Sequence, residues 1–335
     1  AVWSVHWYSL HDTRYTSSLG LDAAIERVAA ESKPGDFLVY DRWKTDELDH
    51  IIPSRVSNFC GDRCPTVEEV LLDYWGPSEQ LPRLEEHLKW LEKLRWAYKR
   101  VWLIPSSITS SNPNSEVQPW FDTYLFKAGC EQFSPETKLC LYYTQTPSDE
   151  LSPVAATPGL RSARSSLFVP LVIAAESPKR NPQAEGPSKM GIEIDALFGD
   201  RIRLNDVLLY WRPPTSQQPG APVITTPGEP LLVELLWQVL ETVDKRYKVS
   251  LQLLDAQGSL VHQLDREPLD GFFPITQWPV RQLWSDRYAF VLPVDLPAGT
   301  YQLNLAVYDP ETGTRLPVGS GDALKLTDLT VVAKP

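Results

Sequence analysis

The densest group of side chains with chemical potential lies directly after a short apolar segment, residues 37–40, that is predicted to be a strand. Ligands bind at the carboxyl ends of strands in open α/β sheets, so the position suits a site. Asp41 and Glu47 could act as paired carboxylates in acid–base chemistry or, with Asp46, bind sugar hydroxyls. The group consists of Asp41, Arg42, Trp43, Lys44, Thr45, Asp46, Glu47, Asp49 and His50.

The same residues also fit the beginning of a helix. Thr45 is a good N-cap, and Asp46 and Glu47 would then lie in the first turn, beside the positive end of the helix dipole. This interpretation needs no ligand, and the sequence leaves both open.

Two tryptophans form a second candidate binding group. Trp278 and Trp284 lie in the polar stretch 271–287, between predicted strands. Exposed indoles on loops of a sandwich would offer flat faces for sugar rings, with Asp and Arg side chains nearby for the hydroxyls. Alternatively, the stretch folds back on the domain and buries both indoles as a plug.

The four cysteines lie in two close pairs, Cys60 with Cys64 and Cys130 with Cys140. An even count of closely spaced pairs predicts two local disulfides and an oxidising, extracytoplasmic compartment. A four-thiolate zinc site and free buried thiols are the alternatives, but the paired Cys-x-x-Cys knuckles typical of zinc sites are absent.

Other signatures of chemistry are missing from the sequence. It contains no G-x-G-x-x-G fingerprint, no phosphate-binding P-loop and no G-x-S-x-G elbow, so we predict no nucleotide cofactor and no serine hydrolase. Oxygen atoms within residues 308–313 could hold calcium, but a hairpin turn initiated by Pro310 explains the same residues. We therefore predict no metal and assign no catalytic residue.

Composition narrows the class of partner. The 335 residues carry a formal net charge of −11 and no long Lys/Arg run, which argues against nucleic acid as a partner. A helix that spans a bilayer needs roughly 18 or more consecutive apolar residues. No run in the sequence approaches that length. Because the chain begins at Ala1 and its single methionine is Met190, we expect that it was processed or cut from something longer.

The pattern of the first half alternates helix and strand. Predicted helices at 21–29, 81–98 and 120–127 are followed by predicted strands at 37–40, 100–104 and 138–143. This alternation predicts a small Rossmann-like α/β domain over residues 1–146. Prolines spread among serines and alanines predict a linker over residues 147–190.

The helical period disappears after residue 190, and short strands separated by Gly, Pro and Asp clusters replace it. This pattern predicts an antiparallel β-sandwich over 191–335, of jelly-roll or immunoglobulin-like type, after the α/β domain. Strict alternation within 249–253 and 301–305 indicates strands with one buried and one solvent-exposed face. The expected strands are 192–197, 207–212, 231–240, 247–255, 260–264, 288–292, 300–309 and 325–332.

The order of motifs in the second half resembles a known family. The motifs are GDRIRL at 199–204, LVELLWQ at 232–238, YKVSLQLLD at 247–255, LV at 260–261, DRY at 286–288, LPAGTY at 296–301 and VYDPETG at 307–313. They resemble the C-terminal extracytoplasmic region of bacterial family 39 (dolichyl-phosphate-mannose mannosyltransferase-like) membrane glycosyltransferases. KPGDFLVY at 33–40 and RVWLI at 100–104 match the small α/β region of those proteins more loosely.

The resemblance implies an address and an accessory role, because the catalytic acids of that family lie in a membrane portion that this sequence lacks. We expect a non-catalytic extracytoplasmic module, at the cell surface or the periplasmic side, attached to the membrane through a segment outside this chain. It would bind glycan or a lipid-linked sugar acceptor, or support assembly with membrane or other surface proteins. The alternatives are a cell-surface structural or assembly subunit and a hydrolase that uses Asp41 and Glu47.

Overall fold

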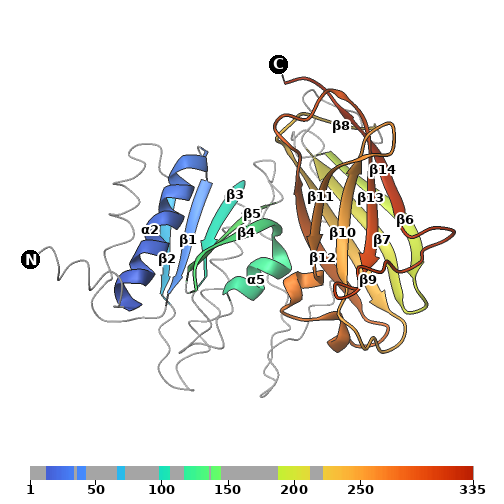
Figure 1. Cartoon of the computed structure of the whole chain (residues 1–335), viewed down its shortest axis with the longest axis horizontal. Coiled ribbons are helices and arrows are strands. Elements are labelled where there is room, and N and C mark those ends of the chain that lie inside the picture. Colours follow the sequence, from blue (N-terminus) through green and yellow to red (C-terminus); the bar gives the residue numbers. More distant parts are fainter. Residues whose placement is uncertain are drawn as a thin grey trace, which may run out of the picture. The chain divides into compact units, whose positions relative to one another are not determined.

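The structure is a computed structural model, and it describes eight ranges of the chain: residues 13–33, 36–42, 66–71, 98–105, 117–135, 137–144, 188–211 and 222–334. The chain divides into two compact units, residues 1–146 and 147–335, and each is described by itself (Figure 1).

Five of the described strands form a mixed sheet in the first unit. Its strands lie in the order β2-β1-β3-β5-β4; the first three are parallel, whereas β5 is antiparallel to both β3 and β4. The elements in chain order are α2 (Thr13–Glu31), β1 (Asp36–Arg42), β2 (Thr66–Leu71), β3 (Arg100–Ile104), α5 (Val117–Tyr124), β4 (Phe126–Ser134) and β5 (Thr137–Tyr143).

Side chains from both helices bury the middle of this sheet. Every residue of β3 is buried, as expected for a strand covered on both faces. Ala24 and Ile25 of α2 pack in one cluster with Trp102, and Phe121 of α5 packs in another with Leu103. Successive residues of β3 therefore face opposite clusters.

The prediction of a Rossmann-like domain is wrong. After the short helix α5, the chain forms the hairpin β4–β5 instead of crossing to another parallel strand, and the described residues contain no Rossmann-like α/β domain. Trp120, Phe121 and Tyr124 lie at helical spacing, which made residues up to 127 resemble one helix. Gly129, interpreted as a helix end, lies in β4 at a shift in register, where glycine is common.

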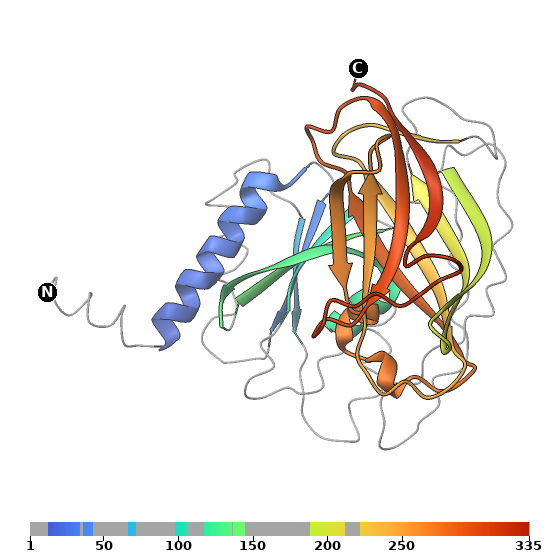
Figure 2. The ribbon, with the colours of Figure 1, turned by 45° about the vertical axis from the view of Figure 1, so that its right-hand side comes forward.

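The described part of the second unit has two sheets. Strands β12, β9, β7 and β6 pair antiparallel in that order. The other sheet has the order β11-β10-β13-β14-β8 (Figures 1 and 2). The strands are β6 (Ser188–Phe198), β7 (Ile202–Trp211), β8 (Val223–Thr225), β9 (Pro230–Val239), β10 (Lys248–Leu254), β11 (Leu260–Arg266), β12 (Leu283–Val291), β13 (Gly299–Tyr308) and β14 (Leu324–Val331).

All eight strands predicted for this half are present, but β7 and β12 begin five residues before the predicted start and β6 begins four residues before it. The prediction of a purely antiparallel sandwich is nevertheless wrong, because the unpredicted strand β8 pairs parallel with β14 and makes the sheet mixed. With three residues, β8 is too short to show an alternation in sequence. Strand β6 begins at Ser188, inside the segment that was expected to be linker.

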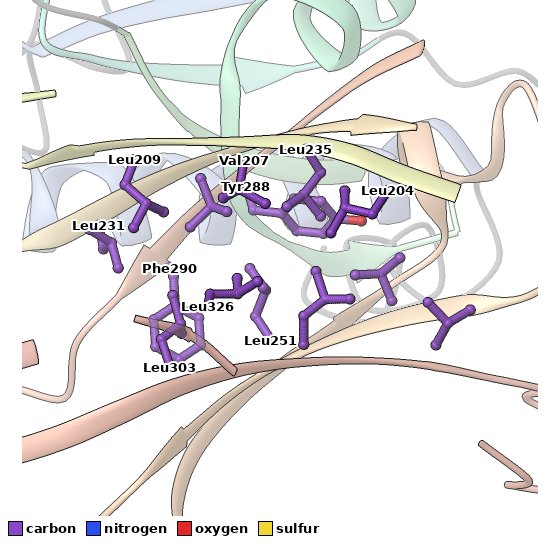
Figure 3. Close-up of a cluster of buried hydrophobic side chains, with 14 of the residues drawn as sticks. Leu204, Val207, Leu209, Leu231, Leu235, Leu251, Tyr288, Phe290, Leu303 and Leu326 are labelled. Carbon is purple, nitrogen blue, oxygen red and sulfur yellow. The ribbon is translucent and has the colours of Figure 1, made fainter. Parts of the chain in front are cut away.

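The inward faces of the two sheets form one hydrophobic core. Figure 3 shows Leu204, Val207 and Leu235 of one sheet opposite Leu251 and Leu303 of the other. All of these side chains are fully buried. Because residues alternate between the two faces of a strand, the intervening positions point away from this core.

Candidate functional site

The outward surface of β10, β11, β13 and β14 carries a row of carboxamides. Gln263 of β11 is the register partner of Gln252 of β10, which is in turn the partner of Asn304 of β13. Asn304 is opposite Lys325 of β14. Directly opposed residues lie about 5 Å apart. The side chains therefore form a line that runs across the strands, here called the amide row (Gln263, Gln252 and Asn304).

The amide row belongs to a larger polar surface, here called the polar face. Its inward neighbours, such as Val249 and Leu305, are core residues, so the alternation of the strands directs the polar side chains outward. The polar face comprises Lys248, Ser250, Gln252, Gln263, Asp265, Gln302, Asn304, Tyr308, Lys325 and Asp328.

Hydrogen bonds within the polar face orient its amides. The Nε2 atom of Gln302 donates to Oδ1 of Asn304 over 2.6 Å, and Nε2 of Gln263 donates to Oδ2 of Asp265 over 3.2 Å. Each pair lies two residues apart on one strand. A carboxamide can donate two hydrogen bonds and accept two, so these bonds leave each group with further donor or acceptor capacity.

Tyr308 supplies the aromatic ring of the polar face. Its hydroxyl is hydrogen-bonded to Asp265, and burial together with the charge and hydrogen bond of Asp265 raises the pKa of the Tyr308 hydroxyl. Tyr308 is on β13 and Asp265 on β11, so the side chains meet over β10, which lies between them. The small residues Ser250 and Ala306 occupy this part of the face, and both are buried.

Charges on the polar face cancel. The Nζ atom of Lys325 lies 2.8 Å from the carboxylate of Asp328, and the second lysine, Lys248, is balanced formally by Asp265. The face therefore offers neutral hydrogen-bonding groups and one ring. Such groups can hydrogen-bond to a ligand.

The sequence pointed to this surface without identifying it. The alternation in 249–253 and 301–305 predicted one wet face, and the structure confirms that these residues form strands with one face in the core. The outward residues Ser250 and Gln252 are buried, so the solvent-exposed face expected for 249–253 is wrong there. The missed signal is the type of the outward residues, which in the middle of both strands are Ser, Gln and Asn and never Lys or Glu.

The two tryptophans proposed as a sugar platform are buried. Trp278 and Trp284 are 4% and 5% exposed and belong to the core of the second unit. Their rings stack with centroids 5.5 Å apart, and Phe273 lies 4.9 Å from Trp284. The indole Nε1 of Trp278 donates to the carbonyl of Phe273 over 2.9 Å. Trp278 lies in the stretch between β11 and β12, which folds back as a plug, whereas Trp284 lies within β12 and not between strands as expected. Of the two alternatives, the buried plug is therefore found and the exposed platform is wrong.

The acidic group of the first half is only partly described. Asp41 lies within β1, opposite Val70 of β2, and not after the end of the strand as expected. Asp46 and Glu47 lie outside the described residues, so their role in binding or in capping a helix stays a prediction.

One of the two predicted disulfides is confirmed. Cys130 and Cys140 are directly opposed on the hairpin β4–β5, with Cα atoms 4.1 Å apart, and they form a disulfide. Cys60 and Cys64 lie outside the described part of the chain. Asp309, in the run considered for calcium, holds a turn: its carboxylate accepts from the Glu311 amide over 2.9 Å and from Lys245 over 3.1 Å.

One carboxylate with a raised pKa, that of Asp286, is buried and has structural partners. Asp286 is fully buried, and burial raises its pKa although the charge of Arg266 opposes this. Its Oδ1 accepts from the Leu269 amide over 3.0 Å, and Tyr288 donates to its other oxygen. Leu269 and Asp270 both have positive φ, a conformation that costs energy for residues other than glycine. The Asp286 carboxylate therefore anchors a strained turn.

A buried ion pair in the first unit also bonds to residues of its own unit. The Nζ atom of Lys127 lies 2.9 Å from Oδ1 of Asp122, and the Tyr142 hydroxyl donates to the same oxygen over 2.7 Å. All three residues are buried, so none is available to a ligand. Among the described residues there is no cluster of His, Cys, Asp or Glu suited to a metal ion. No described helix is long and apolar enough to cross a membrane.

Comparison with known proteins gives little guidance. No family model and no curated protein matches the chain. Among solved structures, the C-terminal domain of wzt is 14% identical, with a TM-score of 0.26, over 46% of this chain and 81% of that one. A CARDB domain from Pyrococcus furiosus is also 14% identical, with a TM-score of 0.22, over 34% and 87%. β-Glucuronidase 2 from Bacteroides uniformis is 10% identical, with a TM-score of 0.24, over 40% and 14%. These similarities are too low to support an argument about this chain.

Proposed function

We propose that this chain is a non-catalytic, extracytoplasmic module that binds glycan through its polar face. The observation that carries the proposal is the amide row, in which Gln263, Gln252 and Asn304 are aligned by the register of three neighbouring strands.

The chemistry of the row matches that of sugar hydroxyls. A hydroxyl both donates and accepts hydrogen bonds, and a carboxamide does the same with a planar group of fixed shape. The ring of Tyr308 adds an apolar surface of the kind that packs against the C–H face of a pyranose. Phosphate or nucleic acid would instead require several cations, and the charges of the face cancel.

A sheet surface that contacts only solvent would be expected to carry other residue types than those of the amide row. Asn is depleted in strands and Gln has no strong strand preference, whereas Thr and other β-branched residues favour such positions. Asn304 and Gln252 nevertheless lie in the middle of β13 and β10. The Gln252 side chain is also buried. Its polar group is therefore held in place at a cost in side-chain entropy.

The proposed location is supported by the disulfide and by the family resemblance. Disulfides persist in oxidising compartments, and Cys130 and Cys140 form a disulfide. The resemblance to family 39 membrane glycosyltransferases supports a module whose catalytic partner domain lies in a membrane portion outside this chain. In this role the ligand of the polar face would be a polymer or lipid-linked sugar that the membrane portion handles.

An assembly subunit that used Trp278 and Trp284 for contacts would bury them against a neighbouring chain. Both indoles pack in the core of their own unit instead, so they are not available for such a contact. No other described feature favours that function.

A panel of immobilised glycans tests the proposal. The intact protein should bind at least one class of glycan, and the double variant Gln263→Ala/Asn304→Ala should lose that binding while it keeps its circular dichroism spectrum and thermal midpoint, because neither side chain is buried. Gln257→Ala is the matched control, because Gln257 is an exposed residue of the β10–β11 turn, beside the polar face and outside it. Equal binding by the double variant and the control would refute the proposal.

A further inference from the structure

We infer that Tyr308 and Asp265 form one sugar subsite, in which the Tyr308 ring packs against the C–H face of a pyranose and the Asp265 carboxylate binds its hydroxyls. This inference rests on the proposed function and adds the residues that contact the sugar ring and the class of ring that they select.

The position of the Tyr308 ring follows from the strands that carry the two side chains. Tyr308 lies opposite Lys248 of β10, and Asp265 lies opposite Ser250 of the same strand. The two residues are therefore separated by two strand spacings, about 10 Å, and by about 7 Å along the strands. A tyrosine that stood upright on the sheet could not bridge this distance, so the hydrogen bond to Asp265 requires the ring to lie along the sheet surface.

The residues beneath this ring are small. Ser250 and Ala306 are register partners that point outward, yet they are only 3% and 0% exposed. A ring that lies over them accounts for their burial, and their small size lets the ring approach with one face toward the sheet. The opposite face of the ring then points outward, and Tyr308 is partly exposed.

The outward face of the Tyr308 ring is open to a ligand. Among the described residues, no second ring and no cation stacks on Tyr308. An aromatic face that is already held in position loses little conformational entropy on binding. Its apolar surface suits the C–H bonds of a sugar ring.

The Asp265 carboxylate adds hydrogen-bond acceptors beside the ring. It accepts from Nε2 of Gln263 over 3.2 Å and is hydrogen-bonded to the Tyr308 hydroxyl. A carboxylate offers about four acceptor positions, so roughly two are left for other donors. Because Asp265 is exposed, a pair of neighbouring sugar hydroxyls can reach these positions.

The ring and the carboxylate together select a sugar by two features. One is a face of C–H bonds that no axial hydroxyl interrupts, which packs against Tyr308. The other is a pair of hydroxyls on adjacent carbons at the edge of that face, which donate to Asp265. The ligand class is therefore a pyranose with one uninterrupted C–H face and a free vicinal diol.

NMR and calorimetric titration with defined sugars test the inference. The probes are the methyl β-glycosides of glucose, galactose and mannose and the β-1,4-linked trisaccharide of each sugar. For each probe that binds, the C–H protons on one face of a ring should receive the strongest saturation transfer from the protein. The same protons should shift upfield in the ring current of Tyr308.

Two variants separate the two contacts. Tyr308→Leu still covers the small residues beneath it but removes the ring, so the Kd should rise about three- to tenfold and the upfield shifts should disappear. Asp265→Asn keeps an acceptor for the Tyr308 hydroxyl but removes the charge. Its Kd should also rise about three- to tenfold, while the upfield shifts remain.

Tyr247→Leu and Gln277→Ala are the matched controls. Tyr247 is also partly exposed, but it packs against the core of the second unit. Gln277 is exposed and lies in the short 3-10 turn Ile275–Gln277, outside the four strands of the polar face. Both control variants should keep the wild-type Kd within about twofold.

The outcomes separate the inference from the proposed function. An unchanged Kd in Tyr308→Leu or in Asp265→Asn overturns the subsite, and so does binding to the immobilised glycans with no affinity for any probe; in these cases glycan binding itself still stands. Absence of binding to the immobilised glycans and to every probe at millimolar concentration overturns the proposed function as well.

Discussion

At the scale of single residues, the same polar side chain types serve two purposes in this protein. Asp286, Asp122 and Lys127 are buried, bonded to other residues of their own unit, and hold elements together. Gln263, Gln302 and Asn304 are partly or fully exposed and lie on one face of one sheet. Gln252 of the amide row is nevertheless buried like the structural groups, so burial alone does not separate the two sets.

Asn304→Ala should weaken glycan binding about two- to tenfold, because it removes one neutral hydrogen-bonding group from the centre of the amide row and Lys325. Stability should change little, since the side chain is only partly buried. Calorimetric Kd values and urea unfolding of the variant check both statements. A large loss of stability with unchanged affinity would show that Asn304 supports the fold instead.

Asp286 should make the free energy of unfolding depend on pH. Its folded-state pKa is raised, mainly by burial. The folded protein therefore binds this proton more tightly than the unfolded chain, whose pKa is about 3.9. The stabilisation from protonation is complete below the unfolded pKa and is lost as pH rises through the folded pKa. In urea unfolding, the stability of the wild type relative to Asp286→Asn should therefore increase as pH falls from 7 toward 4. A difference that is constant with pH would contradict the assigned shift.

At the scale of elements, strands were easier to predict than connections. Alternation and turn residues predicted eight strands of the second unit, because apolar and polar residues alternate along a half-buried strand. The three-residue β8 is too short to carry that period. The hairpin β4–β5 was missed because neither propensity nor spacing in residues 120–143 specifies whether a strand returns antiparallel or crosses over.

The disulfide is the feature that secures this hairpin. Replacing Cys130 by Ala and Cys140 by Val, which preserves volume at the buried Cys140 side chain, should lower the free energy of unfolding by about 2–3 kcal/mol, the value for a closed loop of this size. Urea unfolding of the variant beside the oxidised wild type measures the difference. Identical midpoints and slopes would show that the hairpin holds without its cross-link.

At the scale of the whole molecule, the accessory role and the extracytoplasmic location stay predictions. Cysteine spacing did anticipate the Cys130–Cys140 bond. The amide row was not predictable in the same way, because its members come from three strands whose register only the folded sheet defines. Trp278 and Trp284 illustrate the converse, since a polar sequence neighbourhood concealed that their rings are buried.

The most direct test of the central claim observes the carboxamides themselves. In the intact protein labelled with ¹⁵N-glutamine and ¹⁵N-asparagine, the side-chain NH₂ resonances of Gln252, Gln263 and Asn304 should shift together and saturate with one Kd on titration with the glycan selected from the panel. Those of Gln257 and Gln277 should stay in place. Binding that shifts the control resonances and leaves the amide row unchanged would contradict glycan recognition by the polar face.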